Sequence, residues 1–408
     1  MSDPMDPNGT DGREHQDHGQ GADERAGSVG SGAMESTPAF DAPIPHPHHE
    51  PASLIEALED EPTEVAPISL SRRLRQPRTI LSIVVPLAII AFFLYLNRER
   101  LAQVPELILQ ANPALILLAF IVFYLGFPLR GYRWKRLLQE TGFVISLRNS
   151  VEILYISWFV NCVVPAKLGD VYRAYLLKMN SEASLSRTFG TVFIERILDI
   201  FAIAILGLAA GFWSFRDGMP PAIRLVFIVG FVVVIALGVG LFTMRNFGRR
   251  ILTRLPFPPR ILELYERFEE GVFGAVGLRH LPLLAFLTGM IWMTEGLRLW
   301  LVVQALGFQD VQLGLSGAVF VALIGSLLTA IPLSPAGLGF AQAGVIGVLT
   351  VAYKVPLAEA TAITILDWVI SVLSIIVIGA VVYVVSPMPR GEGRIKVTET
   401  TPSTVPAA

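Results

Sequence analysis

From residue 80 onward the chain alternates between long apolar segments and short polar connections. Residues 80–96 contain no charged side chain, and at about 1.5 Å per helical residue these 17 residues are just long enough to cross a hydrocarbon core. Further long apolar segments lie at 113–129, 188–213, 222–243, 281–307 and 357–385. A buried helix of a soluble protein would explain any one of them, but not the set. The pattern predicts an all-α polytopic membrane protein with about six full transmembrane helices.

Two more apolar segments, 151–164 and 315–351, are broken by proline and glycine. The residues expected to act as hinges at these breaks are Pro165, Gly169, Pro332, Pro335, Gly337 and Gly339. In lipid every backbone N–H and C=O must be satisfied, so such breaks are tolerated where protein shields the chain or where it lines a wet cavity. We therefore expect two re-entrant hairpins that approach the membrane midplane from opposite faces. The alternative is that 315–332 and 342–352 are separate spans, which would give eight.

Three short matches between the halves of this region predict an internal repeat. Residues 131–133 match 296–298 at an offset of 165, 165–169 match 335–339 at 170, and 197–199 match 365–367 at 168. Each match is weak alone, but the common order and nearly constant offset favour a duplication. If each half contributes three full spans and one broken segment, the odd number turns the second half upside down in the membrane. This is the inverted repeat of many secondary transporters.

Composition separates the apolar body from the two ends of the chain. The whole sequence is 53% apolar and 16% charged, with a formal net charge of −2. Residues 1–70 hold 15 Asp and Glu against 2 Arg, a net of −13, which leaves +11 on the rest. Because low hydrophobicity with high net charge cannot bury enough surface to fold, we expect 1–71 to be a disordered acidic tail. Residues 72–388 then form the membrane domain, and 389–408 a second disordered tail.

Basic residues accumulate in alternate connections. Four arginines precede the first span at 72–78, nine Lys or Arg lie within 130–187, and seven lie within 245–279. The intervening connections carry two, one and no basic residue. Since cytoplasmic loops are enriched in Lys and Arg, we predict that these basic regions and both termini are cytoplasmic, with Asn112 and Gln309 outside.

Ionisable residues within the apolar segments carry the functional signal, because a charge at the centre of a lipid-facing helix costs roughly 2.5–3.5 kcal/mol. One interpretation is a set of static ion pairs between helices. We favour a polar cavity between the halves that binds a charged group, since basic residues lie beside the broken helices. The predicted substrate-binding residues are Lys167, Asp170, Arg173, Glu195, Arg196, Asp199, Glu295, Arg298, Gln342 and Asp367.

Signals of catalysis and of bound metals are missing from the sequence. It has one cysteine, Cys162, and six histidines, five of them in the N-terminal tail. It has no phosphate-binding Gly-x-x-x-x-Gly-Lys loop and no His-Glu-x-x-His pair. We therefore expect no metal, no cofactor, no catalytic residue and no nucleic-acid partner.

One set of motifs resembles a known family. The motifs are Arg130-x-x-Arg133-Trp134, Phe159-Val160-Asn161 leading into Pro165-Ala166-Lys167-Leu168-Gly169-Asp170 and Arg173, Glu195-Arg196 with Asp199, and Pro335-x-Gly337-x-Gly339. Over about residues 75–388 the chain resembles the lysylphosphatidylglycerol synthase transmembrane family, also described as a flippase-like domain. The resemblance implies a bacterial or archaeal inner-membrane protein whose hydrophilic cavity handles phospholipid or lipid-linked head groups. Where the family often has glutamate, this chain has Gln342.

The resemblance also bears on the activity that we expect. Full synthases of this name carry a large soluble aminoacyl-transfer domain after the membrane part. Here about 20 residues follow Val385. We therefore do not expect this chain to transfer lysine to a lipid by itself.

Together these observations predict a protein that binds membrane lipids with anionic head groups, or lipid-linked intermediates, and translocates them. The residues predicted to bind the phosphate are Lys167, Arg173, Arg196 and Arg298. The residues predicted to orient them, or to bind a cationic substituent, are Glu195, Asp199, Glu295 and Asp367. One alternative is a membrane-embedded glycosyl- or acyl-group transferase with Asp170 or Asp199 as base. Another is a non-transporting membrane partner of a separate lipid-modifying synthase or transferase.

Overall fold

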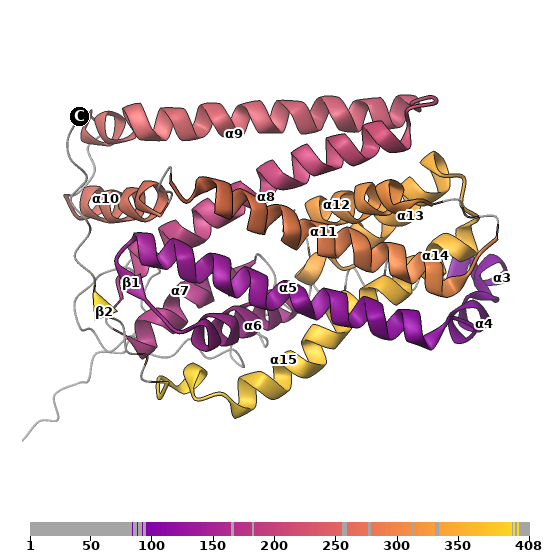
Figure 1. Ribbon diagram of the computed structural model, residues 1–408, viewed down its shortest axis with the longest axis horizontal. Coiled ribbons are helices and arrows are strands. Elements are labelled where there is room, and N and C mark those ends of the chain that lie inside the picture. Colours follow the sequence, from indigo (N-terminus) through magenta and orange to yellow (C-terminus); the bar gives the residue numbers. More distant parts are fainter. Residues whose placement is uncertain are drawn as a thin grey trace, which may run out of the picture. The chain divides into compact units, whose positions relative to one another are not determined.

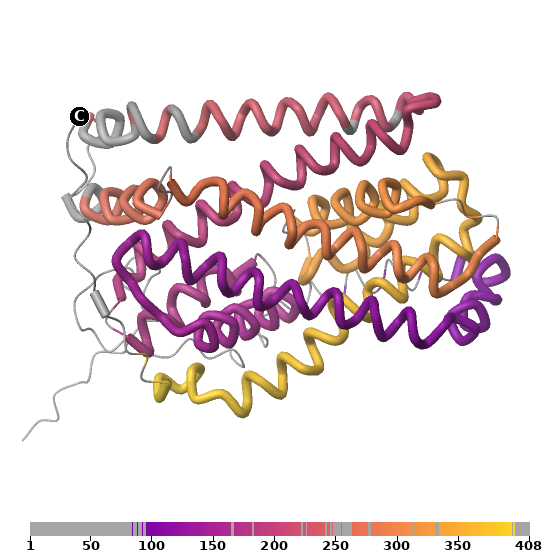
Figure 2. The backbone as a smooth tube through the Cα atoms, in the orientation of Figure 1, coloured from indigo at the N-terminus to yellow at the C-terminus, as the bar shows by residue number. Residues whose placement is uncertain are grey.

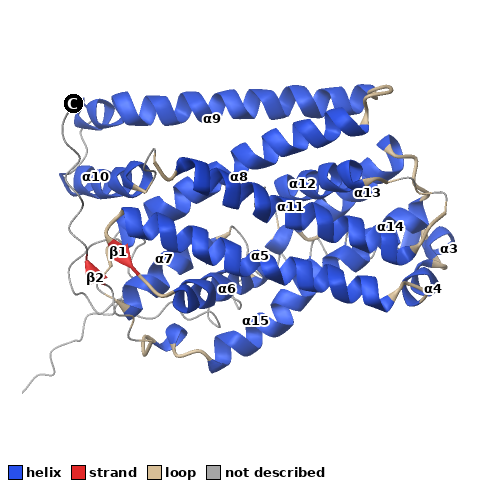
Figure 3. Ribbon diagram, in the orientation of Figure 1, coloured by secondary structure: helices blue, strands red, loops and turns tan. Residues whose placement is uncertain are grey.

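The computed structural model describes residues 95–393, apart from 165–166, 182, 255–258, 276–278, 310, 312 and 331–333, together with positions 84, 88, 92, 395, 398 and 399. The predicted acidic tail at 1–71 lies outside the described residues, as do Pro165, Pro332 and most of the predicted span at 80–96. The described chain is almost entirely helical (Figure 1, and by secondary structure in Figure 3). This confirms the all-α prediction.

The elements are, in chain order, α3 (Arg98–Leu101), α4 (Val104–Leu109), α5 (Pro113–Glu140), β1 (Phe143–Val144), α6 (Leu147–Val163), α7 (Leu168–Asn180), α8 (Leu185–Ser214), α9 (Pro221–Arg254), α10 (Pro259–Gly274), α11 (Leu281–Leu306), α12 (Leu315–Ala330), η2 (Pro335–Gly337), α13 (Phe340–Ala352), α14 (Leu357–Trp368), η3 (Val369–Leu373), α15 (Ser374–Val385), η4 (Met388–Arg390) and β2 (Thr398–Glu399). The π-helical turn η3 joins α14 and α15 into one continuous run. Asn112, Ser146 and Ser184 cap α5, α6 and α8, because each side chain accepts a hydrogen bond from a backbone N–H of the first turn.

Within the described residues, five helical segments are long and apolar enough to cross a membrane, by length and composition alone. They are Pro113–Glu140, Ile223–Gly240, Leu281–Leu306, Pro335–Ala352 and Leu357–Val385. α12 is apolar but shorter, and α8 carries four charged residues in its first half. The chain is a multi-pass membrane protein, as the sequence predicts.

The two halves of the bundle pack in equivalent ways (Figures 1 and 2). α5 lies along α11, while α6 packs against α5 and α12 packs against α11. The last helix of each half contacts the other half, since α8 packs on α12 and α15 packs on α6. The closest approaches also correspond: a methyl group on Gly131 would collide with Val151, and one on Gly296 with Val319. This exchange of contacts supports the predicted internal repeat.

Each half contains a helical hairpin whose tip stops inside the bundle. The α6–α7 hairpin enters from the end near β1, and the α12–α13 hairpin enters from the end near α3 and α4 (Figure 1). The tips meet where α6 contacts η2. The segment Pro335–Ala352 reaches spanning length only across the kink at η2, where Ala336 is not helical. The continuous helices are shorter: α12 has 16 residues and α13 has 13, so they extend about 24 Å and 20 Å, less than a hydrocarbon core of about 30 Å. These lengths favour re-entrant hairpins over the eight-span alternative.

α5 continues eleven residues past the predicted end of its span at 129. The sequence pattern places Arg130 and Arg133 in a loop, because charges usually end a span, but both side chains are buried in the bundle. Lys167 and Arg173 also lie inside the bundle. Four of the nine basic residues within 130–187 are therefore not loop residues. The other five basic residues still outnumber those in each predicted outer connection, so the Lys and Arg distribution still predicts the same orientation.

The C-terminal segment differs from its prediction. The sequence predicts disorder for 389–408, but the described residues of this segment are held on the bundle, and β2 pairs antiparallel with β1. Residues 394, 396–397 and 400–408 lie outside the described residues. The Asn180 side chain donates to the Met388 carbonyl and accepts from the Gly393 amide, and the Ile395 amide donates to the Asn180 carbonyl. The physical reason is that the apolar side chains of Met388 and Ile395 are buried, in a segment whose average composition is polar.

The structure places the two predicted outer connections at the same end of the bundle, since the Asn112 amide donates to the Ala305 carbonyl at 2.7 Å. Asn112 caps α5, so a labelling probe is better placed at Gln110, which is exposed like Gln309. In a Cys162→Ser background, cysteines at 110 and 309 should react with a membrane-impermeant maleimide from outside the cell only, because few basic residues lie at this end. Labelling from the cytoplasmic side alone would reverse the orientation.

Candidate functional site

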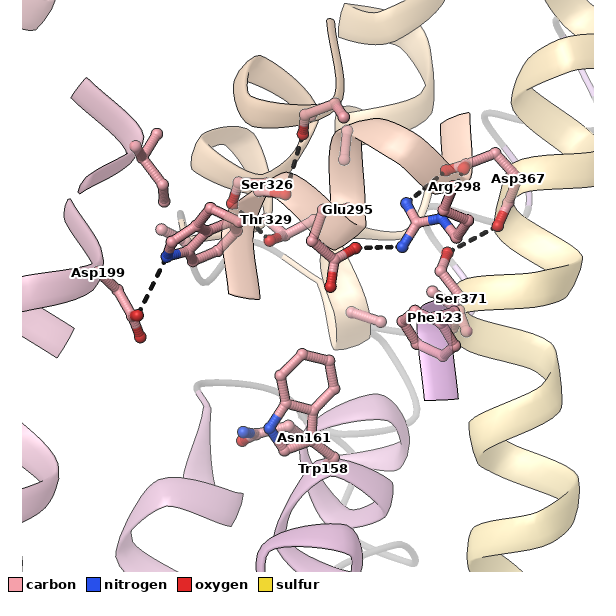
Figure 4. Close-up of a pocket in the computed structure, with 18 of the residues that line it drawn as sticks. Phe123, Trp158, Asn161, Asp199, Glu295, Arg298, Ser326, Thr329, Asp367 and Ser371 are labelled. Carbon is pink, nitrogen blue, oxygen red and sulfur yellow. Dashed lines mark hydrogen bonds and ion pairs between the residues drawn. The ribbon is translucent and has the colours of Figure 1, made fainter. Parts of the chain in front are cut away.

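A cavity of about 440 Å³ lies at the tips of the two hairpins, and residues of α5–α8 and α11–α14 line it (Figure 4). The predicted site residues that line the cavity are Lys167, Asp170, Glu195, Arg196, Asp199, Glu295, Arg298, Gln342 and Asp367. Among the predicted residues, Arg173 is absent from the lining. Nine of the ten predicted residues therefore line one cavity, and their role in binding stays a prediction.

In the first half, Arg133 on α5 is the centre of a buried set of ion pairs. Its side chain is 1% exposed. Nη1 lies 2.6 Å from Oδ1 of Asp199, and Nη2 lies 3.4 Å from Oε1 of Glu195. Nη1 also donates to the Thr288 hydroxyl at 2.9 Å. Arg133 therefore ties α5 to α8 and α11 at the cavity wall.

Arg173, which the sequence assigns to phosphate binding, is fully buried behind the cavity wall. Its Nη1 donates to Oε1 of Glu195 at 3.2 Å, and its guanidinium stacks 4.8 Å from the centre of the Trp134 ring. Arg173 thus holds Glu195 in place and does not face the cavity.

The second half has a similar arrangement around Arg298 on α11. Nε of Arg298 lies 2.8 Å from Oδ1 of Asp367 and Nη2 lies 3.0 Å from Oδ2, a bidentate pairing that fixes both side chains. Nη1 contacts Glu295 one turn earlier. Figure 4 shows Glu295, Arg298 and Asp367 in a row along one wall.

These pairs follow the internal repeat. Arg133 and Arg298 are equivalent at an offset of 165, and their partners Asp199 and Asp367 are equivalent at 168. Each half therefore builds the same ion pair between its first long helix and its last one.

Arg130 and Glu295 are also separated by 165 residues, and they pair with each other at 2.6 Å. Equivalent positions of the two halves meet and neutralise each other, which places this pair on the axis that relates the halves. The sequence analysis did not assign Arg130 to the site. The constant offset was the signal that could have found it, but opposite charges do not register as a match when identical residues are sought.

Arg196 on α8 is the arginine most open to the cavity, with 33% of its side chain exposed. It lies 3.0 Å from Oδ2 of Asp170, 3.2 Å from Oδ2 of Asp199 and 3.5 Å from Oε1 of Glu195. Because three carboxylates share this guanidinium, the protein itself fixes its position.

The break between α6 and α7 brings Lys167 and Asp170 to the cavity. Lys167 has a φ of +54°, a left-handed conformation that costs a side-chain-bearing residue about 1 kcal/mol. Asn161 fixes the break, since it accepts from the Gly169 amide at 2.8 Å and donates to Asp170 at 3.2 Å. Position 169 requires glycine, because a methyl group there would collide with the Ser157 carbonyl.

Lys167 is the cation of the lining that has no ion-pair partner among the residues that the structure describes. The carboxylates of the lining all pair with arginines, and they are Asp170, Glu195, Asp199, Glu295 and Asp367. The cations of the lining are Arg130, Arg133, Lys167, Arg196 and Arg298. Together with Arg173, which pairs with Glu195 from behind the wall, six cations are set against five carboxylates. The described site therefore has one excess positive charge.

The second break carries neutral residues. Ala336, Gly337 and Gly339 all have positive φ, of +50°, +68° and +83°. Gln342 closes the start of α13, because its Oε1 accepts from the Gly339 amide at 2.6 Å. The predicted hinge residues found at the two breaks are Gly169, Pro335, Gly337 and Gly339.

Comparison with known proteins places the whole bundle in one family. Residues 79–379 match the lysylphosphatidylglycerol synthase TM region. The chain belongs to this family. The matched residues include both hairpins, every residue that lines the cavity and the repeat that relates them.

Several curated proteins are similar to this member of the lysylphosphatidylglycerol synthase TM family. A UPF0104 membrane protein of Methanocaldococcus jannaschii is 36% identical over 225 residues, 55% of this chain and 93% of the relative. A second one from that organism is 24% identical over 317 residues, 74% and 92% of the two chains. Glycosyltransferase AglD of Haloferax volcanii is 26% identical over 321 residues, 69% of this chain and 50% of AglD. These relatives are all archaeal, so they give no support to a bacterial source.

Three tryptophans that the sequence analysis did not single out also line the cavity of this family member: Trp158, Trp292 and Trp368. Nε1 of Trp292 donates to Asp199 at 3.1 Å (Figure 4), and Arg130 stacks 4.7 Å from the centre of the Trp158 ring. In an apolar segment, an indole is equally typical of core packing and of the membrane interface, so the sequence offered no signal for them.

Proposed function

We propose that this chain binds the phosphorylated head group of a phospholipid, or of a lipid-linked intermediate, in the cavity and moves it across the membrane. The observation that carries the proposal is Lys167, a cation at a helix break that has no described counter-ion, in a cavity whose carboxylates are already paired. An anionic phosphate supplies the missing charge and makes charge-assisted hydrogen bonds with an ammonium group. Arg196, one third exposed, would be the second contact of the phosphate.

The inverted repeat supports movement of the bound lipid. The hairpin tips enter from opposite ends and meet at the cavity. Rocking of one half against the other would open the cavity first to one side of the membrane and then to the other. The Arg130–Glu295 pair, which joins equivalent positions, would form the pivot, and the arginine-paired carboxylates would hold the walls of each half.

The geometry disfavours the transferase alternative for this cavity. Its candidate bases, Asp170 and Asp199, both lie within 3.2 Å of an arginine. A carboxylate stabilised by arginine in its ionised form is a weak proton acceptor. The arrangement therefore supports charge binding more than proton abstraction.

The similarity to AglD favours a second candidate. The aligned region is half of AglD, so a related membrane region occurs there within a longer protein named as a glycosyltransferase. As the second candidate, we propose that this chain is the membrane partner of a separate transferase or synthase, and holds a lipid for it without transporting that lipid. An inner-membrane location with both termini in the cytoplasm belongs to both proposals.

Lys167→Gln tests the phosphate site directly. A hydrogen bond to a charged group contributes about 1.5–3 kcal/mol, so the affinity for phosphatidylglycerol should fall roughly ten- to hundredfold. The fold should be nearly unchanged, because the described chain gives Lys167 no partner to orphan. Native mass spectrometry of bound lipid and the melting temperature would be measured on the same purified sample. Lys135→Gln, outside the cavity lining, is the matched control.

A Lys167→Gln protein that is folded and keeps its lipid contradicts the phosphate site. A leaflet-resolved assay with labelled phosphatidylglycerol in proteoliposomes separates the two candidates. Transport that is present in the native protein and absent in Lys167→Gln supports translocation. Binding without any transport by the native protein supports the partner function.

A further inference from the structure

The two hairpins contribute different polar groups to the cavity lining. The first hairpin contributes the ionisable residues Lys167 and Asp170, whereas the second, over residues 315–352, contains no ionisable residue at all. Besides Glu295, Arg298 and Asp367, which pair with one another, the second half presents a set of neutral polar side chains, here called the neutral wall: Ser326, Thr329, Gln342, Thr364, Trp368 and Ser371. The cavity therefore offers one ligand an unpaired cation at the first hairpin and neutral polar groups at the neutral wall.

The hydroxyl groups of the neutral wall are available as acceptors. Ser326 donates to the Ala322 carbonyl at 2.9 Å, Thr329 to the Ser326 carbonyl at 2.6 Å, and Ser371 to the Asp367 carbonyl at 2.8 Å (Figure 4). Since each proton is used within the helix, each oxygen keeps lone pairs that can accept from a ligand.

Two side chains of the neutral wall supply donors. The Gly339 amide fixes Oε1 of Gln342, so the Nε2 amide group points elsewhere and has no acceptor among the described residues. Nε1 of Trp368 is buried, and within the described chain it also lacks an acceptor. Donors and acceptors therefore occur on the same wall. This combination suits hydroxyl groups, because each of them both donates and accepts.

Among the described residues that line this cavity, an amine-bearing head group finds no free counter-ion. Each carboxylate of the lining already pairs with an arginine, and the described site carries one excess positive charge. An ammonium group would have to displace an arginine from its partner or lie beside Lys167 as a second unpaired cation. Both arrangements make binding of an amine-bearing head group less favourable.

We infer that the head group bound here is an anionic phosphate ester of a neutral polyol, such as glycerol, inositol or a sugar, and not an amine-bearing one. The phosphate lies at Lys167, and the hydroxyl groups of the polyol bind the neutral wall. This inference rests on the proposed function and specifies its substrate class.

The test uses the full chain in nanodiscs that hold equal fractions of phosphatidylinositol, phosphatidylglycerol, phosphatidylmethanol and phosphatidylethanolamine. Phosphatidylmethanol has the same phosphate diester without a polyol, and phosphatidylethanolamine adds an amine. Native mass spectrometry reports the retained lipid. We expect phosphatidylinositol and phosphatidylglycerol to exceed phosphatidylmethanol roughly three- to tenfold, the effect of one or two neutral hydrogen bonds, and to exceed phosphatidylethanolamine by more.

Two variants examine the neutral wall separately. Gln342→Glu places a carboxylate on α13, a helix without basic residues, and should shift the ratio of phosphatidylethanolamine to phosphatidylglycerol roughly tenfold toward the amine. Gln309→Glu, exposed outside the cavity, adds the same charge as a control. Ser371→Ala adds no charge and should lower the ratio of phosphatidylinositol to phosphatidylmethanol, which keeps the test decisive if Gln342→Glu does not fold.

Equal retention of phosphatidylmethanol and phosphatidylinositol, or a preference for phosphatidylethanolamine, would overturn the polyol assignment while leaving the phosphate site intact. Unchanged ratios in both wall variants would overturn it as well. Retention of every lipid by Lys167→Gln would instead overturn the proposed function itself. The failure of one proposal is thus distinguishable from the failure of the other.

Discussion

Glu295→Gln is expected to lower the free energy of unfolding by about 3–5 kcal/mol, because it leaves the guanidinium of Arg130 buried without a carboxylate. Arg130 is 4% exposed, and Glu295 is the carboxylate that pairs with it in the described chain. The reverse change, Arg130→Gln, should cost less, since Glu295 keeps Arg298 as a partner. The two single variants of this ion pair should therefore lose different amounts of unfolding free energy.

The double variant Arg130→Gln/Glu295→Gln should melt at a higher temperature than Glu295→Gln alone, because it removes the orphaned charge together with its partner. Thermal melts of the native protein, both single variants and the double variant give the complete cycle. Equal losses of unfolding free energy in the two single variants, or purely additive losses in the double variant, would show that another group stabilises the charge of Arg130.

Glu195→Gln should be about as destabilising, again roughly 3–5 kcal/mol, because it isolates Arg173. Arg173 is fully buried, and Glu195 is the carboxylate within ion-pair distance of it in the described chain. Glu270→Gln is the matched control. It removes the same charge from a surface pair with Arg187, in which Glu270 is 62% exposed, and such pairs contribute about 0–1 kcal/mol.

The lipid readout distinguishes this structural role from a binding role. Glu195→Gln and Arg173→Gln should have a lower melting temperature than the native protein and, while folded, should still retain lipid. Lys167→Gln should stay folded and lose its lipid. If Arg173→Gln is folded and empty of lipid, the original assignment of Arg173 to phosphate binding was right, and its position behind the wall must change on binding.

The helices and their breaks could be predicted from the sequence because backbone satisfaction in lipid is a local requirement. The apolar segment at 281–307 becomes α11, Leu281–Leu306, and the Pro/Gly breaks become hairpin tips. Local hydropathy fails at Arg130, where α5 continues through a charge. The residue that neutralises this charge is 165 positions away, and no window along the chain contains both.

The site could be predicted where a charge follows a break, as it does for Lys167 and Asp170. Arg173 lies outside the cavity lining, although a spacing of three residues would place Lys167, Asp170 and Arg173 along one face of a continuous helix. Lys167 has a left-handed backbone and precedes α7, so helical spacing does not relate it to Arg173, whose side chain turns toward Trp134 instead. The excess positive charge could not be read from the sequence either, because it depends on which arginine pairs with which carboxylate.

At the two helix breaks, the residue that would be best for thermal stability is not always the one that the proposed function needs. Lys167 and Ala336 both hold a left-handed backbone, with φ of +54° and +50°, where glycine would relieve about 1 kcal/mol of strain. Selection for heat resistance alone would therefore favour glycine at both positions. At 336 the exchange removes one methyl group. At 167 it removes the unpaired cation, so a thermostabilised version of this protein made for structural work should keep its lysine there.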